Sequence, residues 1–494
     1  MKKVVSLFLA LLMVLSVCSI ASAEDKQITH LVAISAGSRQ PAHDVVLEAA
    51  NEYSREKYGI ELEVRFLDWD PSKVYPIIMA TGDGVDLVWY SNWPGSSGWA
   101  RKGAFVELDE YLEMPEFAAL KAAVPEQSWN DVKIDGHIYE VPAPEVSYSG
   151  QYGICYRADL CEKLNLPVPD TEEHVVEYLM GVKAAYPDVC PFGSVFDRAY
   201  EFKALDRVIW PGVNTFGLIL DEAGESIVKY YGSEDHLHDM RLANQFVKDG
   251  LISRDRQNEA MDNIEKFPNN LTMMEVCHVD TYFGRVNAIE KAKQEDPSKA
   301  DWELGYIPFN AKKGYVQVDS ATGVNGTGVA YAYSDHIMES LTYLQAVLTD
   351  PELHHLLRYG VKGVHYDLDA DGNYVRLSQE YEPCGMSLWQ WRSDALSLEG
   401  ATDKASKEKK EILDLYKSLT PMSSSFSFDK TNVEDEVANY NAVFDEYYKP
   451  LQYGLVDDVE GQVKLFLEKA EQAGLSKIQE EYIKQYTAWA EANK

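Results

Sequence analysis

The residues best suited to chemistry in this chain are aromatic side chains beside polar ones at the ends of predicted strands. Asn92 and Trp93 follow a predicted strand at 85–90, and Trp69 follows one at 60–67. Ligands bind beyond the carboxyl ends of the strands in doubly wound sheets. A flat ring covers the apolar face of a sugar, and planar polar groups bond its hydroxyls. These positions predict non-covalent binding, although Trp69 fits packing in the core or at the rim equally well.

Two pairs of aromatic residues farther along the chain are also candidates. Tyr148 and Tyr152 follow a predicted crossover near 142–148, and one of them is expected to face a ligand if it does not pack within a strand. Trp389 and Trp391 are two residues apart, so in an extended segment their rings point to opposite faces.

The motifs of several common enzyme and metal sites are absent from the sequence. It contains no GxSxG and no HExxH. The five cysteines that follow residue 23 are odd in number and include no CxxC pair, which favours neither a zinc site nor a redox motif. Residues 367–372 begin like an EF-hand loop, but Ser378 stands where that loop needs a bidentate Glu. A hairpin turn is the preferred interpretation, and we expect no metal and no cofactor.

The composition restricts the partners of the protein. The formal net charge is −34 over 494 residues. Such an acidic surface repels nucleic acid and anionic lipid, so neither is an expected partner. After residue 17 no apolar stretch reaches the length of a membrane span.

The first 23 residues have the pattern of an export signal. Lys2 and Lys3 precede an apolar run at 4–17, and Ala21-Ser22-Ala23 fits a cleavage site. Cleavage there predicts a mature chain that begins at Glu24. A membrane anchor and a lipid anchor at Cys18 are the alternatives; a lipobox, however, needs a small residue where this chain has Val17.

The order of the predicted elements indicates an α/β fold. Strands at 30–35, 60–67 and 85–90 alternate with helices, which predicts a doubly wound parallel sheet. The pattern restarts near 149, so a second lobe of the same kind is expected. We expect one lobe at 24–145 with a return segment at about 311–380. The other is expected at 146–310, with additional C-terminal helices at about 381–494.

Several segments together resemble the family 1 extracellular solute-binding proteins of ABC importers, the maltose-binding-like group. They lie, in order, at 85–93 with 103–108, at 136–142, and at 152–160 with 166–171. The segments at 359–366 and 446–489 are similar to those of a subgroup of these proteins that is common in Gram-positive bacteria. Proteins of that subgroup carry an extra C-terminal helical module. The order and spacing of the motifs make the resemblance more specific than any one of them.

The resemblance implies a function and further site residues. It implies two lobes joined by hinge strands, with a carbohydrate, most simply an oligosaccharide, clamped between them and delivered to the membrane permease subunits. It also implies that Trp210 and Asp280 contact the ligand, and that Trp389 or Trp391 closes the cleft. Asp280 is preferred to His278, because a single histidine there more often packs in a core. A monomer without enzymatic activity is expected, and a secreted glycosidase is the alternative.

Overall fold

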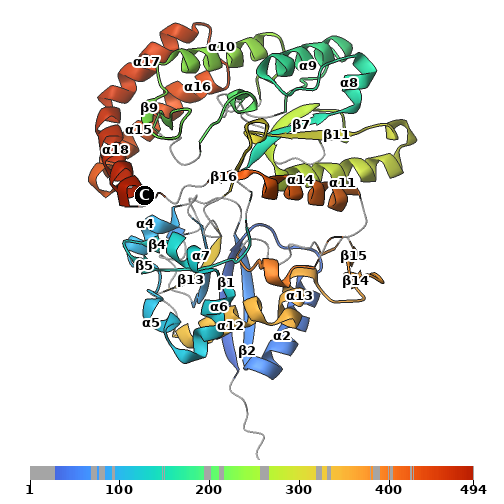
Figure 1. Ribbon diagram of the computed structural model, residues 1–494, viewed down its shortest axis with the longest axis vertical. Coiled ribbons are helices and arrows are strands. Elements are labelled where there is room, and N and C mark those ends of the chain that lie inside the picture. The colour runs from blue at the N-terminus through green and yellow to red at the C-terminus, as the bar shows by residue number, and fades with distance from the viewer. Residues whose placement is uncertain are drawn as a thin grey trace, which may run out of the picture.

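The computed structural model shows a chain folded into two lobes, one above the other in Figure 1. It describes residues 28–67, 75–76, 84–91, 95–146, 148, 151–193, 202–210, 216–255, 266–318, 325–330, 335–378, 380–381, 390–398, 400, 404–422, 426 and 428–492. Within these ranges, no helix combines the length and apolar character that crossing a membrane requires.

The first lobe is built on a five-stranded sheet in the order β2-β1-β3-β13-β6. Strands β2, β1 and β3 are parallel, as predicted, whereas β13 runs antiparallel to both β3 and β6. Helices cover both faces of the parallel part, so the inner strands β1 and β3 are almost entirely buried, whereas the edge strand β2 alternates apolar residues with Glu61, Glu63 and Arg65. The bounds are β1 Thr29–Ala36, β2 Ile60–Leu67, β3 Leu87–Tyr90, β6 Val141–Pro142 and β13 Gly326–Val329.

Local sequence signals fix the ends of several first-lobe elements. Helix α2 (His43–Tyr58) ends at Gly59, whose left-handed backbone lets its N–H bond the carbonyl of Arg55. The Asp350 carboxylate caps α13 by accepting the N–H of Glu352. The remaining elements are α4 Ser96–Arg101, α5 Asp109–Leu112, η1 Pro115–Phe117, α6 Ala118–Ala123, α7 Glu126–Asp131, the hairpin β4 Lys133–Ile134 and β5 His137–Ile138, α12 Ile337–Thr349, α13 Pro351–Tyr359, β14 Tyr366–Leu368, β15 Tyr374–Arg376 and η7 Asp394–Leu396.

The core of the first lobe joins the two ends of its sequence. Leu31 and Leu87 from the early strands pack with Leu344 of α12, and Tyr381 and Trp391 lie in the same buried cluster. The return segment therefore continues to Trp391, beyond the position near 380 expected from the sequence. The physical reason is the burial of these two large rings, which the first lobe needs to fill its core.

The second lobe has a three-stranded sheet with β7 (Tyr152–Arg157) in the centre. Both neighbours, β10 (Met274–His278) and β11 (Leu304–Pro308), run antiparallel to β7, where the sequence analysis expected a parallel sheet. Gly153 of β7 lies so close to β11 that a Cβ atom would collide with the Ile307 carbonyl. The surrounding elements are α8 Asp159–Leu164, α9 Glu172–Ala185, β8 Leu218–Leu220, β9 Ile227–Lys229, α10 Glu234–Lys248, α11 Val279–Glu295, η4 Pro297–Lys299 and η5 Ala311–Lys313.

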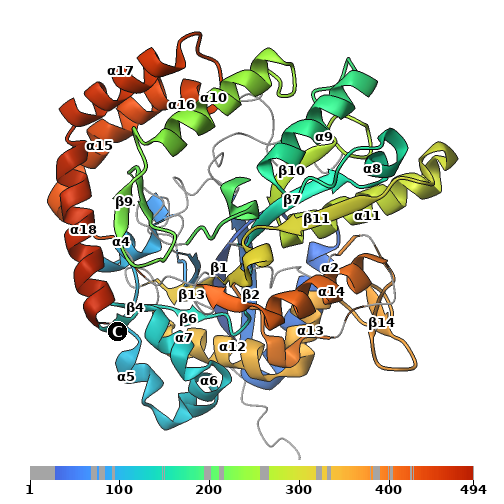
Figure 2. The ribbon, with the colours of Figure 1, turned by 45° about the horizontal axis from the view of Figure 1, so that its top comes forward.

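The C-terminal helices belong to the second lobe. Figure 2 shows α17 beside α10, and Phe216 and Met240 share a hydrophobic core with these helices. Before them, β16 (Thr420–Met422) pairs in parallel with β12 (Tyr315–Gln317), so β12 also lies with this lobe. The elements are α14 Lys404–Ser418, η8 Thr431–Val433, α15 Glu434–Val443, the π-helical turn η9 Phe444–Tyr448, α16 Lys449–Gln452, α17 Val459–Gln472 and α18 Leu475–Ala492. The architecture is the predicted two-lobe α/β fold with extra C-terminal helices.

Candidate binding site between the lobes

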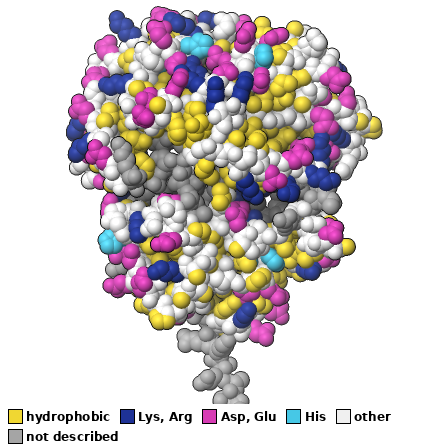
Figure 3. Space-filling view, in the orientation of Figure 1, with side chains coloured by type: hydrophobic (Ala, Val, Ile, Leu, Met, Phe, Trp, Pro, Cys, Tyr) yellow, Lys and Arg dark blue, Asp and Glu magenta, His cyan; other side chains and the backbone are white. Residues whose placement is uncertain are grey.

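The chain crosses between the lobes three times, and several predicted site residues lie near these crossings. The first crossing follows β6, the second lies between β12 and β13, and the third lies between η7 and α14. In Figure 3 the lobes form two masses, with acidic and basic side chains at the boundary between them. Four of the predicted ligand contacts, Asn92, Trp93, Trp69 and Trp389, lie outside the described residues.

Tyr148 and Tyr152 lie at the first crossing, on the side of the second lobe. The ring centroid of Tyr148 is 5.0 Å from that of Tyr416 in α14. Burial, with a smaller effect of the Asp394 charge, raises the pKa of Tyr148. Tyr152 is the first residue of β7. Its ring and that of His278 pack edge to face, with centroids 5.9 Å apart. Both tyrosines are half-buried, so they combine packing contacts with partial access to solvent.

Asp280 lies in the first turn of α11. His278 caps this helix, because its Nδ1 accepts the N–H of Thr281 at 3.4 Å. The Asp280 carboxylate is 3.5 Å from Lys409 Nζ, and 31% of its side chain is exposed. Burial alone would raise its pKa, but the charges of Lys409 and Arg392 help to hold that pKa below its ordinary value. Asp280 therefore stays ionised, so both of its carboxylate oxygens can accept hydrogen bonds from ligand hydroxyls.

The structure adds a charged cluster that the sequence analysis missed. Glu145 lies at the first crossing, with its two carboxylate oxygens 3.5 Å from Arg358 Nη2 and 3.4 Å from Arg392 Nε. These three side chains are at least 80% buried. The charge of Arg392 also helps to lower the pKa of Asp280, which belongs to the other lobe. Glu145 and Arg358 are 213 positions apart and belong to no motif, so no local signal identifies them.

A separate aromatic pair lies near the second crossing. The Trp210 ring centroid is 5.6 Å from that of Tyr315 in β12. Its Nε1–H donates to the Glu222 carbonyl at 3.2 Å, and its ring lies against Gly224, where any larger residue would collide with it. Trp210 is half-buried. It therefore has a fixed orientation and some exposed surface, as a platform for a sugar requires.

Trp391 has a different environment from the other candidates. It is 0% exposed, packs against Tyr343 of α12, and donates its Nε1–H to Thr327 Oγ1 of β13 at 3.1 Å. A side chain without exposed surface in the first-lobe core cannot touch a solute in this conformation. The structure therefore points to a packing role for Trp391, and Trp389 stays a prediction.

The structure also places the possible metal ligands. Residues 367–376 form the β14–β15 hairpin, as preferred from the sequence. The Asp369 carboxylate accepts the N–H groups of Asp371 and Asn373, which makes it part of the turn. Elsewhere, Cys155, Glu275 and Cys277 lie together in the second-lobe core, where Glu275 is paired with the buried Arg285. That pair already occupies the only carboxylate of the group.

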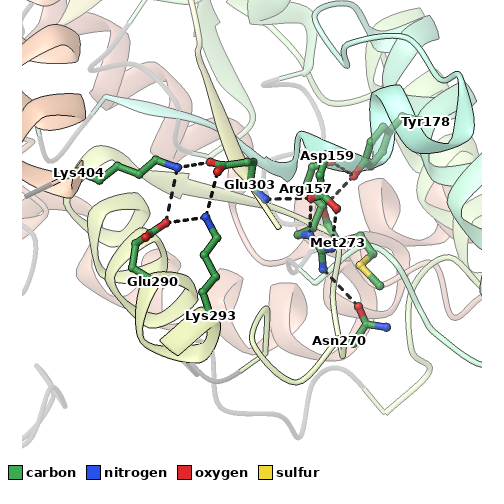
Figure 4. Close-up of polar contacts among 9 residues, drawn as sticks. All are labelled: Arg157, Asp159, Tyr178, Asn270, Met273, Glu290, Lys293, Glu303 and Lys404. Atoms are coloured by element: carbon green, nitrogen blue, oxygen red, sulfur yellow. Dashed lines mark hydrogen bonds and ion pairs between the residues drawn. The ribbon is translucent and has the colours of Figure 1, made fainter. Parts of the chain in front are cut away.

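Two polar networks hold the second lobe together beside the third crossing (Figure 4). Lys404, the first residue of α14, contacts Glu303 and Glu290, and Lys293 bridges the same two carboxylates. Nearby, buried Arg157 donates twice to Asp159 at 2.7 Å. The Lys404 contacts attach α14 to the second lobe directly after the chain has crossed.

Comparisons with known proteins agree with this architecture. The family described as a domain of unknown function (DUF3502) matches residues 422–491, which we call the DUF3502 region. The carbohydrate ABC transporter substrate-binding protein of Streptococcus pneumoniae serotype 4 is 23% identical over 485 residues, which cover 94% of this chain and 91% of that protein. The polygalacturonan/rhamnogalacturonan-binding protein YtcQ of Bacillus subtilis is 21% identical over 407 residues, covering 77% of this chain and 76% of that protein.

The solved structures show the same fold. The crystal structure of the N-glycan transport solute binding protein NgtS from Streptococcus pneumoniae superimposes with a TM-score of 0.72 at 19% identity, covering 94% of this chain and 100% of that chain. Its complex with Man5GlcNAc gives a TM-score of 0.67 at 19% identity, covering 94% of this chain and 99% of that chain. Over nearly its whole length, the chain is thus similar to substrate-binding proteins of carbohydrate ABC transporters, and it has the two-lobe fold of a solute-binding protein.

Proposed function

We propose that this protein is an extracellular solute-binding protein, which captures a carbohydrate between its lobes and delivers it to the permease of an ABC importer. The observation that carries the proposal is similarity over 94% of the chain to a substrate-binding protein of a carbohydrate ABC transporter. An oligosaccharide is the preferred ligand, because N-glycan, polygalacturonan and rhamnogalacturonan are named for the relatives. The protein acts as a monomer and breaks no bond.

The interlobe residues support this proposal through their chemistry. Sugar hydroxyls need ionised or planar polar partners, and Asp280 in the second lobe is held ionised. Trp210 supplies an oriented ring beside the second crossing. Tyr148 and Tyr152 are further contacts at the first crossing. Asn92, Trp93, Trp69 and Trp389 complete the proposed set.

Closure around the ligand follows from contacts on both lobes. A ligand shifts a conformational equilibrium only through its different affinity for the two states. The side chains of Asp280 and Arg392 come from different lobes, and their charges interact across the boundary. A sugar that bonds groups of both lobes therefore favours the closed arrangement, by rigid-body rotation about the crossings.

A glycan panel tests the function. The panel contains Man1GlcNAc, Man5GlcNAc, oligogalacturonates and maltooligosaccharides, and the readouts are thermal unfolding and calorimetric titration. A ligand at a hundred times its dissociation constant adds about 2.7 kcal/mol of stability. Chromatography of the same mixtures tests the glycosidase alternative. Binding without new products supports a carrier, whereas products would indicate an enzyme.

A matched pair of tryptophan variants tests the site. Trp210→Ala is expected to weaken binding of the panel ligand by about 1–3 kcal/mol, with base–aromatic stacking as the nearest measured analogue. Trp302→Ala is the control, because Trp302 lies just before the start of β11 and its ring stacks on Arg157. Trp210 lies toward the opposite end of that strand, since the preceding residue, Ile209, bonds Asn310. Equal affinities for Trp210→Ala and the unaltered protein would contradict the assignment.

Export is a separate part of the proposal. The leader at 1–23 is expected to be removed, and mass spectrometry of the native protein should find Glu24 at the N-terminus. A diacylglyceryl group on Cys18 would instead show a lipid-anchored protein.

A further inference from the structure

Three aromatic side chains form a half-exposed patch in the DUF3502 region, and none of the roles described above explains it. Phe426, Tyr486 and Trp489 are all partly exposed. The centroid of the Phe426 ring is 5.2 Å from Tyr486 and 5.8 Å from Trp489, and these two are 5.5 Å apart. Tyr482, one turn earlier on α18, is buried beneath Phe426. We call the three exposed rings the C-terminal aromatic patch.

The patch moves with the second lobe. Helix α18 is bonded to that lobe by Gln479, whose buried side chain donates to the Phe216 carbonyl at 2.8 Å. Phe428 and Tyr482 extend the same core, and both pack against the Phe216 ring. The patch is therefore attached to second-lobe residues and not to a loose terminus.

The patch also lies where the second lobe approaches the first. Figure 1 places the end of α18 next to α4 of the first lobe, and Figure 2 also shows α4 beside α18. The DUF3502 helix α15 approaches the end of α4, because Glu434 Oε1 is 3.8 Å from Nζ of Lys102, the residue that follows α4. The side chain of Gln485, one residue before Tyr486, makes two hydrogen bonds with the backbone of Asp429. Its Oε1 accepts the Asp429 N–H and its Nε2 donates to the Asp429 carbonyl, both at 2.9 Å. The charge of Arg101 in α4 contributes to the lowered pKa of Asp429, whose main cause is its hydrogen bonds with Thr431.

Strand pairing leads from the candidate site to Met422, four positions before the first residue of the patch. Trp210 contacts Tyr315, and Tyr315 belongs to β12, which pairs with β16. Phe426 follows Met422, the last residue of β16, by four positions. Four residues span at most about 14 Å, so the patch lies close to the end of that strand. A sugar chain that extends from Trp210 in the direction of β16 would therefore approach these rings.

We propose that the C-terminal aromatic patch is an accessory carbohydrate site, on which outer sugar units stack when the ligand is longer than the space between the lobes. The inference rests on the proposed function and deepens it, since it assigns the protein to chains of several sugar units. The patch has the required chemistry: three rings offer flat apolar faces, and Gln485, which precedes Tyr486 in the chain, belongs to a hydrogen-bonded set of polar side chains with Glu481 and Asn432.

A double variant tests the inference. Tyr486→Ala with Trp489→Ala is titrated against the longest panel glycan that binds and against its shortest binding fragment. The long glycan should bind about ten-fold more weakly, which corresponds to about 1.4 kcal/mol, and the fragment should bind as before. Tyr447→Ala is the control, because Tyr447 is a half-exposed tyrosine of the same region outside the patch. Trp489→Phe should retain most of the affinity for the long glycan.

Each outcome decides between the alternatives. Failure of the unaltered protein to bind any panel glycan would contradict the proposed function and this inference together. Equal affinities of variant and unaltered protein for both lengths would overturn the inference alone. Equal weakening for the two lengths, with a lowered unfolding temperature, would show that the rings support the fold and are not an accessory site.

Discussion

Glu140 offers a sharp test of the packing in the first lobe. This residue lies between β5 and β6, is 1% exposed, and its Oε2 atom finds no hydrogen-bond partner among the described residues. Gly326 of β13 packs so closely against it that a Cβ atom would collide with Oε2. Burial raises the pKa of Glu140 well above its ordinary value of 4.5. The side chain is therefore protonated and neutral in the folded protein at mildly acidic pH.

The Glu140→Gln variant should become progressively more stable than the unaltered protein as pH rises. Above pH 4.5 the unfolded chain releases the Glu140 proton while the folded chain keeps it, so the unfolded state is favoured. The free energy of unfolding of the unaltered protein then falls, relative to the variant, by about 1.4 kcal/mol for each pH unit. The difference grows until the folded-state pKa is reached. Glutamine has nearly the same volume and carries no titrating proton.

Denaturant unfolding of both proteins at pH 5.5 and pH 6.5 measures this difference. Glu116→Gln is the control, because it makes the same substitution at an exposed carboxylate of the same lobe. A Glu140→Gln effect that is the same at both pH values would refute the reasoning. So would a variant that loses stability relative to the unaltered protein between pH 5.5 and pH 6.5.

Three further substitutions test the packing of the chain. Trp391→Ala should lower the free energy of unfolding by about 3–5 kcal/mol in denaturant melts, because it empties a fully buried site; a loss under 1 kcal/mol would contradict the core assignment. Asp159→Asn should lower the free energy of unfolding by about 3–5 kcal/mol, because it leaves the Arg157 charge buried without its partner. Calorimetry at neutral pH should show a lower melting temperature, and an unchanged one would argue against the buried ion pair. Gly454→Ala should loosen the C-terminal helices, because the new Cβ collides with the Ala243 carbonyl and φ is +66° there; proteolysis should then cut this region faster, and an unchanged pattern would refute the steric argument.

The elements that depend on local patterns were predictable from the sequence. The strand at 60–67 has the predicted bounds, and the turn at 135–136 has the left-handed backbone that Asp-Gly favours. Such features depend on neighbouring residues only. Pairing between distant strands does not, which is why the antiparallel sheet of the second lobe differed from the expectation. β10 is 117 residues beyond the end of β7, and periodicity carries no direction.

The candidate site was predictable to a smaller extent. Trp210 and Asp280 could be named from their motifs, and the structure gives each an environment compatible with binding. Trp391 shows the limit of such reasoning: a tryptophan near a crossing can fill a core as well as a cleft, and its burial depends on α12 and β13. The contacts of Glu145 with Arg358 and Arg392 join three separate segments, so only the folded structure brings them together.

The position of β13 has a consequence for the order in which the protein can fold. This strand lies between β3 and β6, although more than 180 residues separate it from β6 in the chain. The first lobe therefore cannot complete its sheet, nor bury Trp391, until most of the polypeptide has been synthesised. Contacts of such long range slow folding, because a long loop must close before they form. The chain thus passes through a prolonged stage in which neither end of the first lobe has its partner, and the second lobe, whose sheet lies wholly between these ends, is free to form first.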